Sequence, residues 1–326
     1  MVAPHNITGE EMPPVRFDLL FLTLLSCTMA GILIWLYSVS SVEYKDCSNA
    51  TMAIRTIVHQ ESLSQTYISE FRDALEVNLD LLPVMSTPGF CVVDWYVWNS
   101  STANLDPYGV CRHTSLSDCA YFSSPDRRIA TGIKEEELNT DHIHRIGVIA
   151  HEWFHVYQDS FLQIHGKMDR YLPSSTPKWY QEGTAALYES MYVRTYHGAD
   201  YLLQQNPANN DAKHIRVLTD PGYFESSQSE ESNYSASLFI VLVLYDRLRQ
   251  SISEVDAVRA ILGGFYMFSE GNTFQDRFES AFNLTVQDLY SNLTSGAYNA
   301  SYDYTDNNNR LMGPGGVYAT LDEVAA

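Results

Sequence analysis

Two histidines and a glutamate stand close together in the pentapeptide His151-Glu152-Trp153-Phe154-His155. Residues four apart lie one above the other on one face of an α-helix, so both imidazoles could reach a single metal ion. Glu152 would then lie beside a water molecule on that ion. This spacing is typical of zinc sites that hydrolyse amide bonds, and it predicts such a centre here. The alternative is a pair of core histidines next to an exposed glutamate.

The residues around the pentapeptide predict the helix that this site requires. Apolar residues recur over Ile143–Tyr157, and neither Gly nor Pro occurs between Val148 and Leu162. Thr140 and Asp141 precede this stretch and provide a plausible N-cap. The pentapeptide is therefore expected on a buried helix.

An open tetrahedral zinc site requires a third protein ligand. The extended motif HExxHxxGxxH is excluded, because Gln158 and Phe161 occupy its Gly and His positions. A second helix is expected after Pro177, and it carries the segment WYQEGTAALYE over 179–189. This segment resembles the W-x-x-E-G-x-A segment of gluzincin metallopeptidases, the clan of thermolysin and the aminopeptidase N family. The resemblance implies that Glu182 is the third zinc ligand.

The same resemblance implies roles for two further residues. Glu189, two turns after Glu182, takes the place of an acid that hydrogen-bonds a ligand histidine; an exposed helix carboxylate is the alternative. Tyr234 opens an apolar helix that is expected to run to about Arg249. In related proteins a Tyr in such a position donates its hydroxyl to the developing oxyanion, and the alternative is an ordinary core or surface Tyr.

The resemblance covers about residues 143–293, including an F-x-x-x-F-x-x-x-F pattern over 274–282 that is similar to the closing helices of small gluzincin domains. Two departures limit it. Twenty-six residues separate His155 from Glu182, more than in those families, which predicts an inserted loop from about 160 to 178. The G-A-M-E-N-type segment that binds a free amino terminus is absent, so aminopeptidase activity is not implied.

The rest of the sequence predicts an α+β, mainly helical fold, and the resemblance implies a thermolysin-like zincin catalytic core with a small N-terminal sheet. Apolar residues at helical spacing predict one long helix over 53–82. β-forming residues predict strands at 91–98 and from 128 onward, with a loop between them over 99–126. Residues 204–231 are expected to form a loop with short helices. Gly263-Gly264 predicts a helix break.

A membrane anchor is expected near the N-terminus. The 24 residues of Leu19–Val42 carry no charge and are long enough to cross a bilayer. We predict a cytoplasmic tail at 1–16, a transmembrane signal anchor at 17–42, a membrane-proximal helical segment at 43–90, a zinc metallopeptidase domain at 91–297 and a flexible tail at 298–326. A cleaved signal ending near Val39-Ser40-Ser41, which would yield a secreted protein, is the alternative.

Cysteines and glycosylation motifs indicate which side of the membrane the domain occupies. Four of the five cysteines follow the apolar span, which suggests two disulfides: Cys47, Cys91, Cys111 and Cys119. Three pairings are possible, and the short loop between Cys111 and Cys119 favours that pair. Acceptor tripeptides follow the span at Asn49, Asn99, Asn233, Asn283, Asn292 and Asn299. The catalytic domain is therefore expected to be extracellular or lumenal.

The net charge of -20 argues against nucleic acid as a partner, because the chain would repel phosphate backbones. The sequence therefore predicts a membrane-anchored zinc peptidase that acts on peptides or proteins. His151, His155 and Glu182 would hold the zinc, Glu152 would be the general base and Tyr234 would assist at the oxyanion. Two alternatives stay open: a cell-surface binding module that keeps the zincin fold without turnover, and a metal-dependent hydrolase of a non-peptide amide.

Overall fold

The described part of the chain is mainly helical and contains one small sheet. The computed structural model describes residues 53–58, 63–82, 92–101, 119–123, 128–136, 142–164, 176–204, 212–225, 234–271, 273–296 and 321–325. The chain divides into two units, Met1–Asp46 and Cys47–Ala326, and all described residues belong to the second. The predicted tail and anchor at 1–16 and 17–42 therefore lie outside them. No helix among the described residues is long and apolar enough to span a membrane.

The sheet has four strands in the order β1-β2-β4-β3: β1 (Ala53–Val58), β2 (Val92–Asn99), β3 (Cys119–Ser123) and β4 (Arg128–Ile133). The β1-β2 and β2-β4 pairs are parallel, and β3 runs antiparallel to β4. The predicted strands at 91–98 and 128 are confirmed, and so is a small sheet before the helix of the pentapeptide. Helix α2 (Gln65–Leu81) connects the parallel strands β1 and β2.

Two predictions for this region are wrong. The single helix expected over 53–82, within the helical segment predicted at 43–90, is a strand followed by a helix, because Ile54, Thr56, Ile57 and Val58 form a β-branched run that pairs with β2. The loop expected over 99–126 contains β3, which begins at Cys119. Cys47, Cys91 and Cys111 lie outside the described residues, so the disulfides stay a prediction.

Asn99, one of the predicted glycan acceptors, ends β2 and is buried. Its side-chain Oδ1 accepts a hydrogen bond from the backbone N–H of Ser101 at 2.9 Å. A glycan needs an exposed attachment point, so the burial of Asn99 disfavours a glycan at this residue. Asn283, by contrast, is exposed at the end of a helix.

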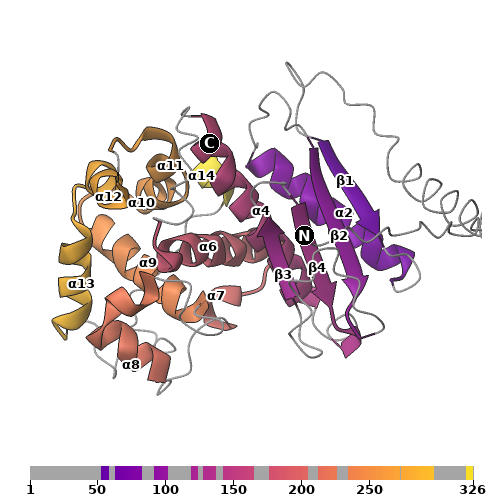
Figure 1. Cartoon of the computed structure of the whole chain (residues 1–326), viewed down its shortest axis with the longest axis horizontal. Helices are drawn as coiled ribbons and strands as arrows, with labels where there is room; N and C mark the ends of the chain where they lie inside the picture. The colour runs from indigo at the N-terminus through magenta and orange to yellow at the C-terminus, as the bar shows by residue number, and fades with distance from the viewer. Residues whose placement is uncertain are drawn as a thin grey trace, which may run out of the picture. The chain divides into compact units, whose positions relative to one another are not determined.

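Three helices form the centre of the fold: α4 (His142–Ile164), α6 (Lys178–His197) and α9 (Tyr234–Leu248). Figure 1 shows α6 between the strands on one side and the later helices on the other. The later elements are α7 (Tyr201–Gln204), α8 (Ala212–Thr219), the 3-10 helix η4 (Pro221–Glu225), α10 (Glu254–Arg259), the π-helical turn η5 (Ala260–Gly264), α11 (Phe265–Phe268), α12 (Phe274–Phe282), α13 (Val286–Thr294) and α14 (Leu321–Ala325). The helices expected from Tyr234 and at the 274–282 pattern are confirmed, as are short helices within 204–231. Helix α4 extends to Ile164, so the loop expected from 160 begins later than predicted.

Helices α6 and α9 approach closely at Gly183, the glycine of the W-x-x-E-G-x-A segment. A Cβ atom at this position would lie 2.4 Å from the backbone oxygen of Ser237 on α9. No side chain can be accommodated at that distance without moving one helix. Gly183 therefore lets α9 lie directly against the helix that carries Glu182.

We expect Gly183→Ala to lower the free energy of unfolding by about 1–3 kcal/mol, the usual cost of overpacking a core. Gly222→Ala is the matched control, because a Cβ there would meet only Asp220 Oδ1 at 4.0 Å. Thermal or denaturant unfolding of both variants measures the difference. Equal stability of the two variants would show that the helix contact at Gly183 tolerates a methyl group.

The helix break expected at Gly263-Gly264 does not occur: the chain continues through η5 into α11. A π-helical turn absorbs the irregularity while the backbone stays helical. The end of the tail predicted at 298–326 also differs from expectation, since α14 packs with Leu321 buried. Arg259 holds this helix by donating to the carbonyl oxygens of Val324 at 3.0 Å and Glu323 at 2.7 Å.

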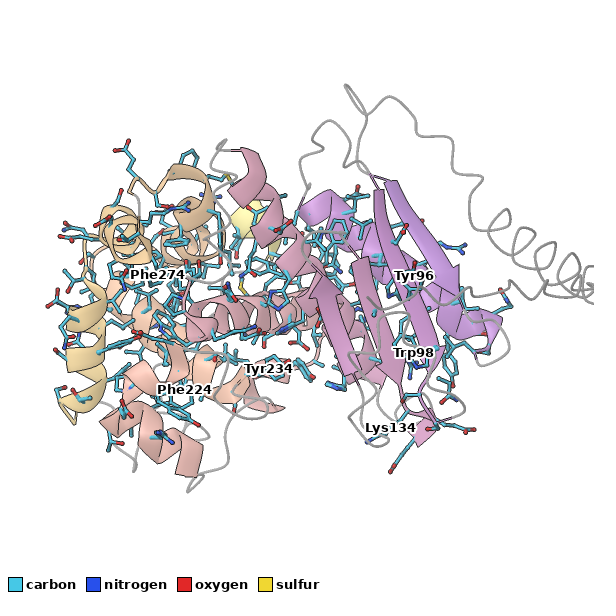
Figure 2. The ribbon with its side chains drawn as sticks, viewed as in Figure 1. Tyr96, Trp98, Lys134, Phe224, Tyr234 and Phe274 are labelled. Carbon is cyan, nitrogen blue, oxygen red and sulfur yellow. The ribbon has the colours of Figure 1, made fainter. Side chains whose placement is uncertain are left out.

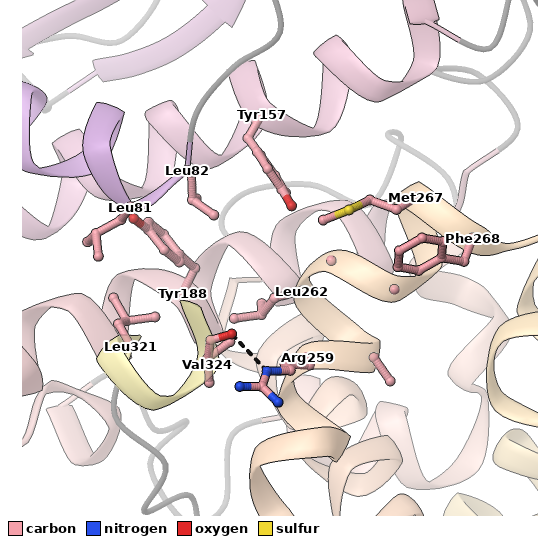
Figure 3. A pocket seen from close by; sticks show the side chains of 13 residues that line it. Leu81, Leu82, Tyr157, Tyr188, Arg259, Leu262, Met267, Phe268, Leu321 and Val324 are labelled. Carbon is pink, nitrogen blue, oxygen red and sulfur yellow. Dashed lines mark hydrogen bonds between the residues drawn. The ribbon is translucent and has the colours of Figure 1, made fainter. Parts of the chain in front are cut away.

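An apolar pocket of about 600 Å³ lies beside α14. Figure 3 shows Tyr157 and Tyr188 on its walls with Leu262, Met267 and Val324. None of the residues predicted to hold metal or perform catalysis lines this pocket. It is therefore distinct from the candidate site described next.

Candidate metal centre

The three predicted ligands converge in the structure. His151 and His155 lie one turn apart on α4, and Glu182 lies in the second turn of α6. Glu182 Oε2 is 3.2 Å from Nε2 of His151 and 3.2 Å from Nε2 of His155. The three ligand atoms all lie within 4.8 Å of one another. Among the described residues, this is the group of His, Cys, Asp and Glu side chains that could hold a metal ion.

The donor set fits a zinc ion. Two ligands about 2.0–2.1 Å from a tetrahedral zinc lie ~3.3 Å apart, close to the two separations at Glu182. Two imidazoles and a carboxylate also suit zinc better than calcium or magnesium, which prefer oxygen ligands. Lys178 donates to the other oxygen of Glu182, Oε1, at 2.8 Å. This contact leaves Oε2 facing the two histidines.

The face of α4 that points away from the two histidines is packed in the core and holds the helix in place. Trp153 and Phe154 of the pentapeptide are fully buried. The indole N–H of Trp153 donates to the backbone oxygen of Leu82 at 3.3 Å, just beyond the end of α2. The apolar residues inside the motif therefore anchor the helix, while the histidines face α6.

Glu189 is buried beside His151, so the exposed-carboxylate interpretation is wrong. Its Oε2 lies 3.1 Å from Nδ1 of His151, the ring nitrogen that does not face Glu182. Gly147, one turn before His151, makes this possible, because a Cβ there would lie 2.8 Å from Glu189 Oε1. A carboxylate in this place fixes the imidazole with Nε2 directed at the ligand position.

Glu152 is buried, and its Oε2 has no hydrogen-bond partner among the described residues. Burial raises the pKa of this carboxyl group, and the imidazoles of His155 and His151 oppose the shift. A buried polar atom without a partner is rare and marks a place where a further polar group belongs. Next to the two histidines, that group would be a water molecule or a substrate.

The carboxylates make the site favourable for positive charge. Burial alone would lower the pKa of His151, but hydrogen bonds with Glu182 and Glu189 outweigh it and raise the pKa to about 10. Burial likewise opposes ionisation of Glu182, yet His155 and His151 hold its pKa well below the usual range. The same carboxylates would stabilise a cation bound between the three ligand atoms.

Tyr234 reaches the site from the start of α9, where Figure 2 labels it. Its ring lies 5.2 Å from the ring of His151, centre to centre and edge-on. Although the residue is 44% exposed, desolvation of its hydroxyl and then the carboxylates of Glu182, Glu152 and Glu189 raise its pKa. The phenol therefore stays protonated at neutral pH and can donate a hydrogen bond.

Two residues that support the ligands, Gln158 and Lys178, were not predicted from the sequence. Gln158 Oε1 lies 2.8 Å from Nδ1 of His155, and its only sequence signal was a position one turn after His155. Lys178 precedes Glu182 by four residues, a spacing that places both on one helix face.

In comparisons with known proteins, no protein-family model matches this chain and no curated protein matches it.

Proposed function

We propose that this chain is a zinc-dependent peptidase with a thermolysin-like catalytic core. One observation carries the proposal: two imidazole nitrogens and a carboxylate oxygen converge beside buried Glu152, whose Oε2 has no hydrogen-bond partner in the part of the chain that the structure describes. A structural zinc site would need four protein ligands and no such glutamate. A site with three ligands and an adjacent base suits hydrolysis.

Zinc held by His151, His155 and Glu182 would lower the pKa of a bound water and polarise a substrate carbonyl. Glu152 accepts the proton that the attacking water loses. It then passes this proton to the nitrogen of the leaving amine, so the carboxylate is regenerated as the C–N bond breaks. The position of Glu152 supports this role, because its Oε2 is buried beside the two histidines and has no hydrogen-bond partner among the described residues.

Peptides or proteins are the proposed substrates, and the domain is proposed to face the extracellular or lumenal side behind an anchor at 17–42. The support for the anchor is the uncharged span in the sequence.

Digestion of a broad peptide library with and without a chelator tests the activity. Cleavage that the chelator stops and zinc restores is expected. Zinc binding without cleavage of any peptide would favour a binding module or a hydrolase of another amide.

Tyr234→Phe should lower kcat by roughly 10²–10³, the usual cost of losing one oxyanion donor, and should leave KM within a few-fold. The reason is that the hydroxyl would contact the carbonyl oxygen only as negative charge develops on it. Steady-state kinetics on one cleaved peptide separates the two constants. Tyr223→Phe in η4 is the control. A raised KM with unchanged kcat would assign Tyr234 to substrate binding instead.

A further inference from the structure

Gln158 connects three helices behind the candidate metal centre. It lies on α4 and is buried, with 6% of its surface exposed. Its Nε2 is surrounded by three oxygen atoms: the backbone oxygen of Gln181 at 3.1 Å, Thr184 Oγ1 at 2.9 Å and Tyr266 OH at 2.8 Å. Two of these belong to α6 and the third to α11.

These neighbours determine which way the amide of Gln158 points. The backbone oxygen of Gln181 can only accept a hydrogen bond, so the NH₂ group must face it. Thr184 Oγ1 already lies 2.7 Å from the backbone oxygen of Tyr180, to which it donates, and is left as an acceptor for Gln158. Reversing the amide would place two acceptors against each other. Oε1 is therefore directed toward His155.

The orientation of Gln158 determines where His155 carries its proton. Oε1 lies 2.8 Å from Nδ1 of His155 and can only accept, so Nδ1 must hold the hydrogen. In the neutral ring, the lone pair is then on Nε2, which faces Glu182 Oε2 at 3.2 Å. This is the tautomer that a metal ion at the site requires.

The same side chain also sets the spacing between two ligands. Gln158 binds His155 through its oxygen, and through its nitrogen it binds the backbone carbonyl of Gln181, the residue before Glu182. A rotation of α4 relative to α6 would break one of these bonds. His151 is held differently, by the carboxylate of Glu189. A neutral amide at His155 orients the ring without adding a further negative charge.

We propose that Gln158 is a positioning residue for the metal centre: its amide fixes the tautomer of His155 and the separation of His155 from Glu182. The inference rests on the metal site of the proposed function and does not depend on peptide hydrolysis. It makes zinc affinity, rather than activity, the quantity to measure.

Gln158→Leu removes the amide while keeping a side chain of similar size. We expect the Kd for zinc, measured by competition with a chelator, to rise about 10- to 100-fold, as for other residues that orient a ligand histidine. Tyr266→Phe is the matched control in the same network. An NH₂ group has two hydrogens and two acceptors remain, so this variant should bind zinc within about threefold of the unaltered chain.

A second measurement needs no variant. In the zinc-bound chain with ¹⁵N-labelled histidine, NMR should find the proton of His155 on Nδ1. A proton on Nε2, or an unchanged Kd in Gln158→Leu, would overturn the inference while leaving the metal centre intact. If the unaltered chain bound no zinc, the proposed function and this inference would both fail. If it bound zinc but cleaved no peptide, only the proposed function would fail.

Discussion

Glu152→Gln should retain zinc, but its rate of peptide hydrolysis should fall by roughly 10²- to 10⁴-fold, the range for a lost general base. Gln keeps the volume and a hydrogen-bonding tip but cannot accept the proton from the attacking water. Glu152 supplies none of the three converging ligand atoms, so zinc should remain bound in the variant. The loss should fall on kcat, since the proton moves only as the reaction proceeds.

Zinc content and initial rates should be measured together on the same Glu152→Gln preparation. Glu279→Gln is the control, because this glutamate is exposed on α12, a helix that contributes no residue to the site. Loss of zinc in Glu152→Gln would mean that this residue supports metal binding. Full hydrolysis at full zinc occupancy would place the activity at another site.

Glu182→Ala should weaken zinc binding by more than the roughly 10- to 100-fold cost of losing an orienting partner, because it removes a ligand atom itself. Only two imidazoles would remain for the ion, and Lys178 would lie near them without its carboxylate partner. Titration with zinc against a chelator measures the change.

His165→Ala is the comparison for Glu182→Ala. His165 is the next histidine after the pentapeptide in the sequence and lies outside the described residues, and its substitution tests a rival third ligand. Retained zinc affinity in Glu182→Ala, combined with loss of zinc affinity in His165→Ala, would contradict the proposed gluzincin-like set of ligands. Loss in Glu182→Ala alone is the expected result.

The helices of the candidate site were predictable because their signals are local. His151 and His155 share a helix face by spacing alone, and the apolar residues around them require burial. Pro177 before α6 and the glycine at 183 are features of backbone geometry that a sequence displays directly. The convergence of His151 and His155 with Glu182 was predicted only from the resemblance, since the spacing of residues within one helix gives no information about a second helix.

The predictions from sequence failed where helical and strand patterns compete, or where a residue's contacts lie far away in the sequence. Residues 53–58 matched a helical pattern, but pairing with β2 decided in favour of a strand. Gln158 bonds Tyr266, which lies 108 residues away, and no local pattern reveals such a pair. The burial of Glu189 likewise depends on the space left by Gly147 on a different helix.

Elemental analysis and X-ray absorption at the zinc edge, on the purified full chain prepared without chelator, test the metal centre most directly. The account predicts one zinc per chain, bound by two imidazole nitrogens and a carboxylate oxygen, with an additional light atom completing the shell. Absence of a transition metal, or a zinc shell without imidazole nitrogen, would contradict it.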